Sequence, residues 1–323
     1  MAPSVITKFE EEFGIEVKEV TYENQEELYA LLEAENYKYD LAIASRSSVK
    51  RLSDRELIRE LDSEKLSGMG DFNPKFRNLG VDPENRYTVP YFWGSTLVAY
   101  RSDLVPFDPE KSFSSIFNPE LAGKTAVLSD HMERFAVANK HLGVEVNDRS
   151  EASLKSASDV LTSYVKDLRG KFLNDQDIRD QLKSGELWLS HCYNGDAAMI
   201  ANEMPVIKYF LPEEGAGLWL DLIVMTREAK NQEAAYNFIS FMNRADICAE
   251  NANYVCYATP NEAAMPLVDK KLLEDPAIFP PSDLLDKCEF FEDASPEQIN
   301  RMSALSGAMF GQAHKSPIVS ETD

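Results

Sequence analysis

A tryptophan and an aspartate stand two residues apart, Trp219 and Asp221, in the apolar segment 215–226. The segment leaves a glycine turn and becomes strongly apolar, which predicts a strand whose second half is buried. On a strand these two side chains point to the same face. An indole beside a carboxylate suits a small organic cation, which needs a π face and a counter-charge. A buried tryptophan beside a strand-end aspartate is the structural alternative.

Two more acids, Asp130 and Glu133, stand three residues apart at the expected start of a helix. This spacing places both on one helical face. It is also the spacing of a capping box, which needs no ligand. Glycosidase carboxylates would have to flank a bond about 5 Å or more apart. Taken alone, the residues favour capping, with His131 as a solvated residue at the helix start.

Three other residues could share a cleft with these acids. Asp175 and Tyr193 follow expected strands, and Tyr257 lies in a loop, although each residue type in such a place is more often structural. Asp196 is expected to cap a helix that ends at residue 203. The sequence has no glycine-rich phosphate loop, no Gly-x-Ser-x-Gly elbow and no His-Glu-x-x-His helix. Carboxylates and aromatic rings are therefore a richer signal than catalytic groups.

The overall composition narrows the class of protein. The chain has 323 residues, a formal net charge of -22 and 44% hydrophobic residues. Such a charge repels nucleic acids and anionic membranes, so neither is an expected partner. The four cysteines lack the close pairs of a zinc site, and no metal or other cofactor is expected. Their spacing leaves one or two disulfides open if the protein is exported.

Helical and extended patterns alternate along the chain, after a first helix that begins at Pro3. Strands are expected at residues 15–20, 39–44, 124–128, 171–173, 187–191 and 206–211. Helices are expected at residues 25–34, 49–61, 132–142, 151–168, 177–183, 231–254 and 296–312. This alternation predicts a mostly parallel sheet with helices on its faces. Ligands bind such sheets at the carboxyl ends of strands, which puts Ser45 near any site.

The extended segment 87–100 is long enough to run between two lobes, and the apolar end of segment 215–226 is the natural second crossing. Two α/β lobes joined by extended crossings describe a hinged cleft protein. The first lobe is expected to hold residues 1–97 and 224–265. The second is expected to hold residues 98–223 and 266–312, followed by a tail at 313–323.

The chain closely resembles the bacterial spermidine/putrescine-binding proteins of ABC transporters, a branch of the extracellular solute-binding proteins. The resemblance runs from Pro3 to about Asp293. It rests most specifically on Tyr-x-x-Pro-Tyr-x-Trp-Gly at residues 87–94, on Trp-x-Asp at 219–221 and on Tyr-x-Thr-Pro-Asn at 257–261. It implies a two-lobed periplasmic-binding-protein fold of type II, with a hinged cleft that closes over a polyamine.

The resemblance also implies roles for individual residues. Asp130 and Glu133 match the family's paired acidic ligands, which replaces the capping interpretation. Trp219 and Asp221 match its Trp-x-Asp pair. Further ligand contacts are implied for Tyr257, the family's loop tyrosine, and for Ser45, which matches a family serine. They are also implied for Tyr193, which replaces the usual tryptophan, and for Asp175, an extra acid that replaces a serine.

The chain departs from the family pattern in three places. The family's first strand, with its aromatic-rich loop, should precede Pro3 and is absent, as is a signal peptide. We expect that the chain as given lacks its native start. Ser47 stands where an aromatic residue is usual, and Phe291 where a polar side chain can help to bind the terminal amine.

The sequence therefore predicts a monomeric, extracytoplasmic binding protein that delivers spermidine or putrescine to an ABC permease and catalyses no reaction. Three alternatives remain open. One is a polyamine sensor that docks on a signalling receptor, and another is a binding protein for a different small cationic solute. The third is a hydrolase that uses Asp130 and Glu133. An anionic solute would need an arginine in the cleft, and none of the matched positions is basic, although Arg46 lies next to Ser45.

Overall fold

The computed structural model describes residues 1–22, 25–34, 38–77 and 79–310. In these residues the strands form one eight-stranded mixed sheet with the order β1-β7-β2-β5-β3-β4, to which β6 adds on β2 and β8 on β7. The strands are β1 (Leu41–Ser45), β2 (Thr88–Arg101), β3 (Thr125–Leu128), β4 (Lys171–Leu173), β5 (Leu189–Tyr193), β6 (Ile207–Phe210), β7 (Gly217–Met225) and β8 (Glu289–Phe290).

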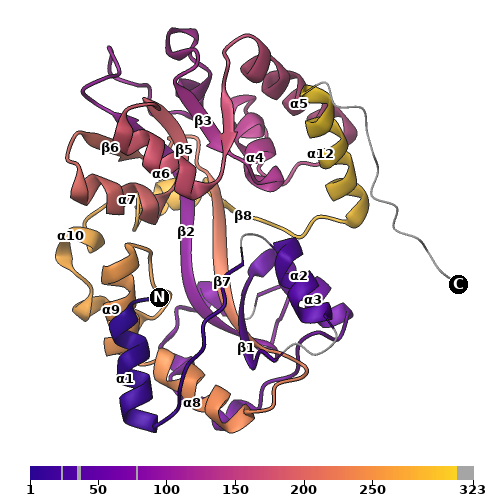
Figure 1. Ribbon diagram of the computed structural model, residues 1–323, viewed down its shortest axis with the longest axis vertical. Helices are drawn as coiled ribbons and strands as arrows, with labels where there is room; N and C mark the ends of the chain where they lie inside the picture. The colour runs from indigo at the N-terminus through magenta and orange to yellow at the C-terminus, as the bar shows by residue number, and fades with distance from the viewer. Residues whose placement is uncertain (23–24, 35–37, 78, 311–323) are drawn as a thin grey trace, which may run out of the picture.

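Helices surround this sheet at both of its ends (Figure 1). They are α1 (Pro3–Phe13), α2 (Gln25–Glu33), α3 (Val49–Asp54), α4 (His131–His141), α5 (Glu151–Lys166), α6 (Asp175–Ser184), α7 (Asn194–Glu203), α8 (Gln232–Met242), α9 (Ala245–Val255), α10 (Lys270–Leu273), α11 (Ser282–Leu285) and α12 (Pro296–Met309). We call the lower group, with β1, α1–α3, α8 and α9, the first lobe. The upper group, with β3–β6, α4–α7 and α12, is the second lobe.

The antiparallel strands β2 and β7 run between the two lobes (Figure 1). β2 pairs with β7 over its first half and with β5 and β6 over its second half. Its side chains are buried from Thr88 to Ala99 with one exception, Tyr91. A strand covered on both faces needs such a continuous apolar run, which explains the conspicuous sequence of this segment. The segment predicted to cross between lobes is therefore one central strand.

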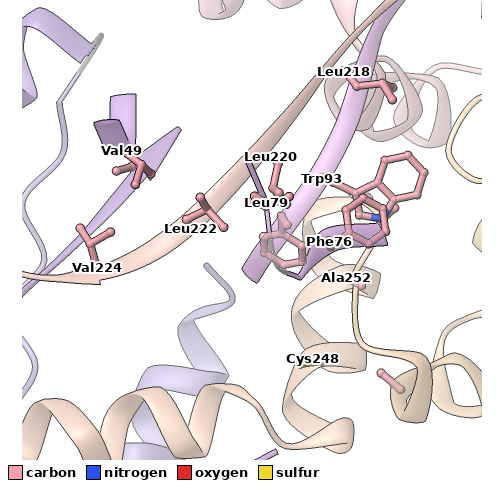
Figure 2. Packing of buried hydrophobic residues seen from close by; sticks show 14 of the residues in the cluster. Val49, Phe76, Leu79, Trp93, Leu218, Leu220, Leu222, Val224, Cys248 and Ala252 are labelled. Atoms are coloured by element: carbon pink, nitrogen blue, oxygen red, sulfur yellow. The ribbon is translucent and has the colours of Figure 1, made fainter. Parts of the chain in front are cut away.

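Strand β7 presents different surroundings on its two faces. Leu218, Leu220, Leu222 and Val224 alternate along the strand and pack in one core cluster (Figure 2). Ile223 and Met225, on the opposite face, belong to a second cluster. By the same alternation Trp219 and Asp221 lie on the face of Ile223 and Met225, but nearer the second lobe. The half of β7 at residues 222–225 thus packs into the core, whereas the half with Trp219 and Asp221 can carry functional polar groups.

In the second lobe, β3 lies between β5 and β4 and runs parallel to both. Leu128, the last residue of β3, is paired with Leu173, the last residue of β4. The backbone nitrogen of Ser129 also donates to the Leu173 carbonyl oxygen at 2.8 Å. The carboxyl ends of the three strands therefore meet at one edge, as predicted for ligand binding in such sheets.

The expected strand at residues 15–20 is wrong. This stretch belongs to no ladder among the described residues. The backbone nitrogen of Val17 instead donates to the side chain of Glu10 at 2.8 Å, and Ile15 and Val17 pack against the cluster that contains Phe9. Within the described part of the chain, β1 is paired with β7 alone.

Two predicted helices differ in length from those observed. The helix expected over residues 49–61 ends at Asp54, where the positive φ of Glu56 turns the chain away. Ile58 then forms an isolated bridge with Thr226. The helix expected over residues 231–254 is divided into α8 and α9, which meet at Asn243 and Arg244. A break of only two residues hardly changes the apolar periodicity of the sequence, so the pattern did not predict it.

Other expectations concern the cysteines, the tail and the lobe boundaries. All four cysteines are free thiols, and three of them are buried. The tail expected at residues 313–323 lies outside the described residues. The residue boundaries of the two lobes remain predictions. No helix among the described residues is long and apolar enough to cross a membrane.

Candidate functional site

The ends of β3, β4 and β5 place three groups of candidate residues along one edge of the second lobe. Asp130 follows β3 at the start of α4, Asp175 begins α6 after β4, and Tyr193 ends β5. Burial raises the pKa of the Tyr193 hydroxyl well above its usual value, and the carboxylates of Glu133, Asp130, Asp175 and Asp196 raise it further. Tyr193 is therefore the ring around which the acids of this lobe gather.

Asp130 and Glu133 play different structural roles. Asp130 caps α4, because its Oδ1 accepts from the backbone nitrogens of Met132 at 2.8 Å and Glu133 at 3.1 Å. Glu133 turns instead toward β2, where the Thr96 hydroxyl donates to its Oε2 at 3.2 Å. The spacing of a capping box is thus present, but only Asp130 is seen to cap the helix.

Glu133 is buried, and no cationic side chain of the described residues balances its charge. Its side chain is 6% exposed, and its Oε2 lies 3.6 Å from Nε2 of His191 on β5. Burial lowers the pKa of His191 to about 3, so the imidazole is neutral near pH 7. Burial, and then Asp130, raise the pKa of the Glu133 carboxyl well above its usual value. A positive charge placed beside Glu133 would relieve this cost.

Asp221 is the second acid without a countercharge. It lies on β7 opposite Ser45 of β1 and Phe92 of β2. Burial raises its pKa from 3.8 to about 7. Among the described residues no side chain forms a hydrogen bond or ion pair with its carboxylate. A carboxylate held in this way is poised for an external cation.

Two tyrosines that were not predicted from the sequence, Tyr22 and Tyr91, lie close enough to Asp221 for its charge to act on their hydroxyl groups. Burial, followed by the Asp221 charge, raises the pKa of Tyr22 to about 12, and the same two causes raise that of Tyr91. The Tyr22 hydroxyl donates to the carbonyl of Ile43. The Tyr91 hydroxyl is buried and finds no partner in the described residues. Tyr91 belongs to the Tyr-x-x-Pro-Tyr-x-Trp-Gly motif at residues 87–94, but the sequence alone does not show the direction of its side chain.

Three aromatic rings meet beside these acids. The rings of Trp219 and Tyr257 are 4.8 Å apart and perpendicular, and those of Tyr193 and Trp219 are 6.3 Å apart at 90°. Two glycines make room for them. A Cβ added at Gly195 would lie 2.4 Å from the Tyr257 ring, and one added at Gly94 would lie 2.5 Å from Trp219. The aromatic rings predicted from sequence are therefore brought together.

Asp175 is already paired within the chain. Nη1 of Arg179 lies 2.9 Å from Asp175 Oδ2 and 2.8 Å from Asp196 Oδ2. Asp196 is 5% exposed and lies in the first turn of α7, whose N-cap is Tyr193, so the capping role predicted for Asp196 is wrong. Arg179 stands four residues after Asp175, a spacing that predicts a helical ion pair, but no pattern in the sequence connects it to Asp196.

Ser45 lies at the end of β1 in the first lobe, where it is paired with Asp221 of β7. Its hydroxyl oxygen lies 2.9 Å from those of Ser47 and Ser48. The nearby Arg46 is directed elsewhere, since its Nη1 donates to the carbonyl of Phe291 at 2.8 Å. Among the described residues there is no group of three or more histidines, cysteines or acids arranged to hold a metal ion.

Known proteins share this sequence and fold. The family model described as bacterial extracellular solute-binding protein matches residues 4–280. The spermidine/putrescine-binding periplasmic protein of Salmonella typhimurium is 29% identical over 294 residues, which cover 90% of this chain and 83% of the relative. The putrescine-binding periplasmic protein PotF of Escherichia coli is 30% identical over 303 residues, with coverages of 88% and 81%.

Solved structures agree with this comparison. The spermidine/putrescine transporter substrate-binding protein PotD of Streptococcus pneumoniae superposes with a TM-score of 0.85 at 26% identity, and covers 96% of this chain and 95% of its own. An ABC transporter protein of Listeria monocytogenes gives a TM-score of 0.88 at 29% identity, with the same coverages. The predicted two-lobed periplasmic-binding-protein fold of type II is thereby confirmed. The chain belongs to the bacterial extracellular solute-binding proteins, which confirms the predicted binding role in place of catalysis and the predicted location outside the cytoplasm.

Proposed function

We propose that this protein binds a linear polyamine, spermidine or putrescine, between its lobes and delivers it to an ABC permease. One observation carries the proposal: within the described residues the buried Glu133 and the partly buried Asp221 have no cationic partner, and the rings of Tyr193, Trp219 and Tyr257 gather near them. The relatives named above as spermidine/putrescine-binding and putrescine-binding proteins support the choice of ligand.

Each predicted site residue has a part in this proposal. Asp130 and Glu133 form one anionic pole, and Asp221 forms the other. The rings of Trp219, Tyr193 and Tyr257 cover the methylene groups and the faces of the ammonium groups. An ammonium ion that enters a closed cleft loses hydration worth many kcal/mol, so each nitrogen needs its own carboxylate or several acceptors.

Ser45 is proposed to supply a hydroxyl group to the ligand at the end of β1. Asp175 was predicted as a further acid for the ligand. Because it forms an ion pair with Arg179, we assign it a different role, together with that arginine. The permease is the proposed receiver of the ligand, and the binding protein is proposed to act as a monomer. The kind of transporter to which the named relatives belong supports the proposed permease.

Isothermal titration calorimetry tests the ligand class. We expect saturable binding of putrescine or spermidine at pH 8, and no heat of binding with glutamate or maltose. A variant with Glu133→Gln and Asp221→Asn should lose the polyamine signal, because both poles become neutral. Glu120→Gln removes an exposed acid from the second lobe and should bind as the parent does. Equal binding of glutamate and putrescine by the parent would exclude a polyamine site.

A further inference from the structure

Arg179 is held between two carboxylates at the edge of the candidate site. Its Nη1 donates to Asp175 at 2.9 Å and lies 2.8 Å from Asp196. The Asp196 side chain is 6% exposed and that of Arg179 is 20% exposed. Removing the partner of a buried acid is costly, so these ion pairs hold the guanidinium group in place.

This cluster, Asp175, Arg179 and Asp196, lies next to the rings that line the site. The carboxylates of Asp175 and Asp196 act on the Tyr193 hydroxyl together with those of Asp130 and Glu133. Burial raises the pKa of the Tyr257 hydroxyl well above its usual value, Asp196 raises it further and Arg179 lowers it, so both charged groups lie near this ring. The guanidinium group therefore lies near Tyr193 and Tyr257, two of the aromatic residues of the candidate site.

We propose that Arg179 is a specificity-determining residue: by pairing with both Asp175 and Asp196 it withholds these two carboxylates from the ligand and so restricts the ligand to a linear diamine. This inference rests on the proposed function. The remaining acids form two poles, because Asp130 and Glu133 belong to one turn of α4 and Asp221 lies alone on β7. Two poles match the two ammonium groups of putrescine.

A triamine would meet a different balance of charge. Its third ammonium group would have to compete with Arg179 for Asp175 and Asp196 or remain without a carboxylate in a closed cleft, and both arrangements are unfavourable. Lys would keep the charge of Arg179, whereas Gln would free both Asp175 and Asp196 for a ligand nitrogen. The charge at position 179, more than its shape, is therefore expected to decide between the two ligands.

Competition calorimetry with putrescine and spermidine tests the inference on the full chain. The parent should bind putrescine more tightly. Arg179→Gln should raise the affinity for spermidine relative to putrescine by about tenfold or more, a change equivalent to one well-placed charge pair. Arg179→Lys should keep the parent's ratio within about threefold. Arg301→Gln, which removes an exposed charge from α12, is the matched control and should not change the ratio.

A second variant protects the test against misfolding. If Asp196 without its partner destabilises Arg179→Gln, then Arg179→Gln with Asp196→Asn removes the uncovered charge and still leaves Asp175 free for a third ammonium group. The same shift toward spermidine is expected. A parent that prefers spermidine, or an unchanged ratio in a folded variant, overturns the inference alone. A parent that binds neither polyamine overturns the proposed function as well.

Discussion

Asp221 is the residue on which the proposed site depends most directly. Asp221→Asn keeps the size of the side chain but removes the charge that would pair with a buried ammonium group. Leaving that cation unpaired should cost about 2–5 kcal/mol, roughly 30-fold to several thousand-fold in affinity. Calorimetry with putrescine measures the loss. Trp219→Leu, which removes only the π face, should cost less, on the order of 1–2 kcal/mol.

The alternative interpretation of this pair makes the opposite prediction. If Trp219 and Asp221 were core residues only, both substitutions would lower the melting temperature sharply and leave the affinity almost unchanged. A binding titration and a thermal scan on the same two variants separate these outcomes. Asp221→Asn that binds putrescine as tightly as the parent would show that Asp221 pairs with no ligand nitrogen.

The raised pKa of Asp221 predicts a pH dependence of stability. Because burial raises this pKa from 3.8 to about 7, the folded chain holds a proton here that the unfolded chain has lost between about pH 4 and pH 7. The ligand-free protein therefore loses stability at this group as pH rises through that window. Asp221→Asn should gain about 1–3 kcal/mol over the parent between pH 4.5 and pH 8.

Urea denaturation of the parent and the variant at both pH values measures this gain. The difference between the two proteins is the useful quantity, because His191 contributes the opposite slope in each. Its folded pKa of about 3 lies below its ordinary value of 6.5, so its contribution to stability is lost as pH falls. A constant difference between variant and parent from pH 4.5 to pH 8 would contradict the burial of the Asp221 charge.

Spacing along the chain identifies some of these residues but not all. Asp130 with Glu133 and Trp219 with Asp221 are close in sequence, so helix and strand periodicity place each pair on one face. Their grouping with Tyr193 and Tyr257 came from the family resemblance. Arg179, Thr96 and His191 were missed, and Asp196 was given only a capping role, because their partners come from other elements and a single sequence does not report such contacts.

At the scale of elements, the close approach of α7 to the Tyr257 loop can be tested. An added Cβ at Gly195 would lie 2.4 Å from the Tyr257 ring, closer than packed atoms allow. Gly195→Ala should therefore displace the ring, cost about 1–3 kcal/mol of stability and weaken putrescine binding. Gly80→Ala is the control, because nothing lies within 4 Å of its added Cβ. Chemical denaturation and calorimetry measure the two effects.

A Gly195→Ala variant with the parent's stability and affinity would mean that Tyr257 can move without cost. That result would remove Tyr257 from the proposed site, because a ring that covers a ligand has to be held in place. Loss of stability without loss of affinity would instead assign Tyr257 to packing between the lobes.

The elements themselves were predictable where their patterns were regular. Strand β2 and helices α4 to α7 follow from continuous apolar runs or helical periodicity. Residues 15–20 alternate like a strand, yet they pair with no neighbour in the described chain. A strand needs a neighbouring strand for its backbone hydrogen bonds as well as an alternating sequence. The alternation of one segment does not show whether such a neighbour is available. The break between α8 and α9 depends on packing in the same way.

At the scale of the whole molecule, the proposed site takes its residues from both lobes and thereby couples them. Asp130 and Glu133 belong to the second lobe, Tyr257 follows α9 of the first, and Asp221 lies on β7 between them. When Glu133 and Asp221 are both ionised, closing the lobes brings uncompensated negative charges out of water, which favours an open cleft. A bound diamine supplies two positive charges and favours closure, so ligand and closure should be linked.

Small-angle X-ray scattering at pH 8 tests this linkage. Putrescine at 100 times its dissociation constant should reduce the radius of gyration of the parent, and should stabilise the folded protein by about 2.7 kcal/mol. Glutamate at the same concentration should do neither. Asp221→Asn should need far more putrescine for the same compaction, because one pole is lost. Calorimetric binding of putrescine with no change in the radius of gyration would show that the ligand enters a cleft that is already closed.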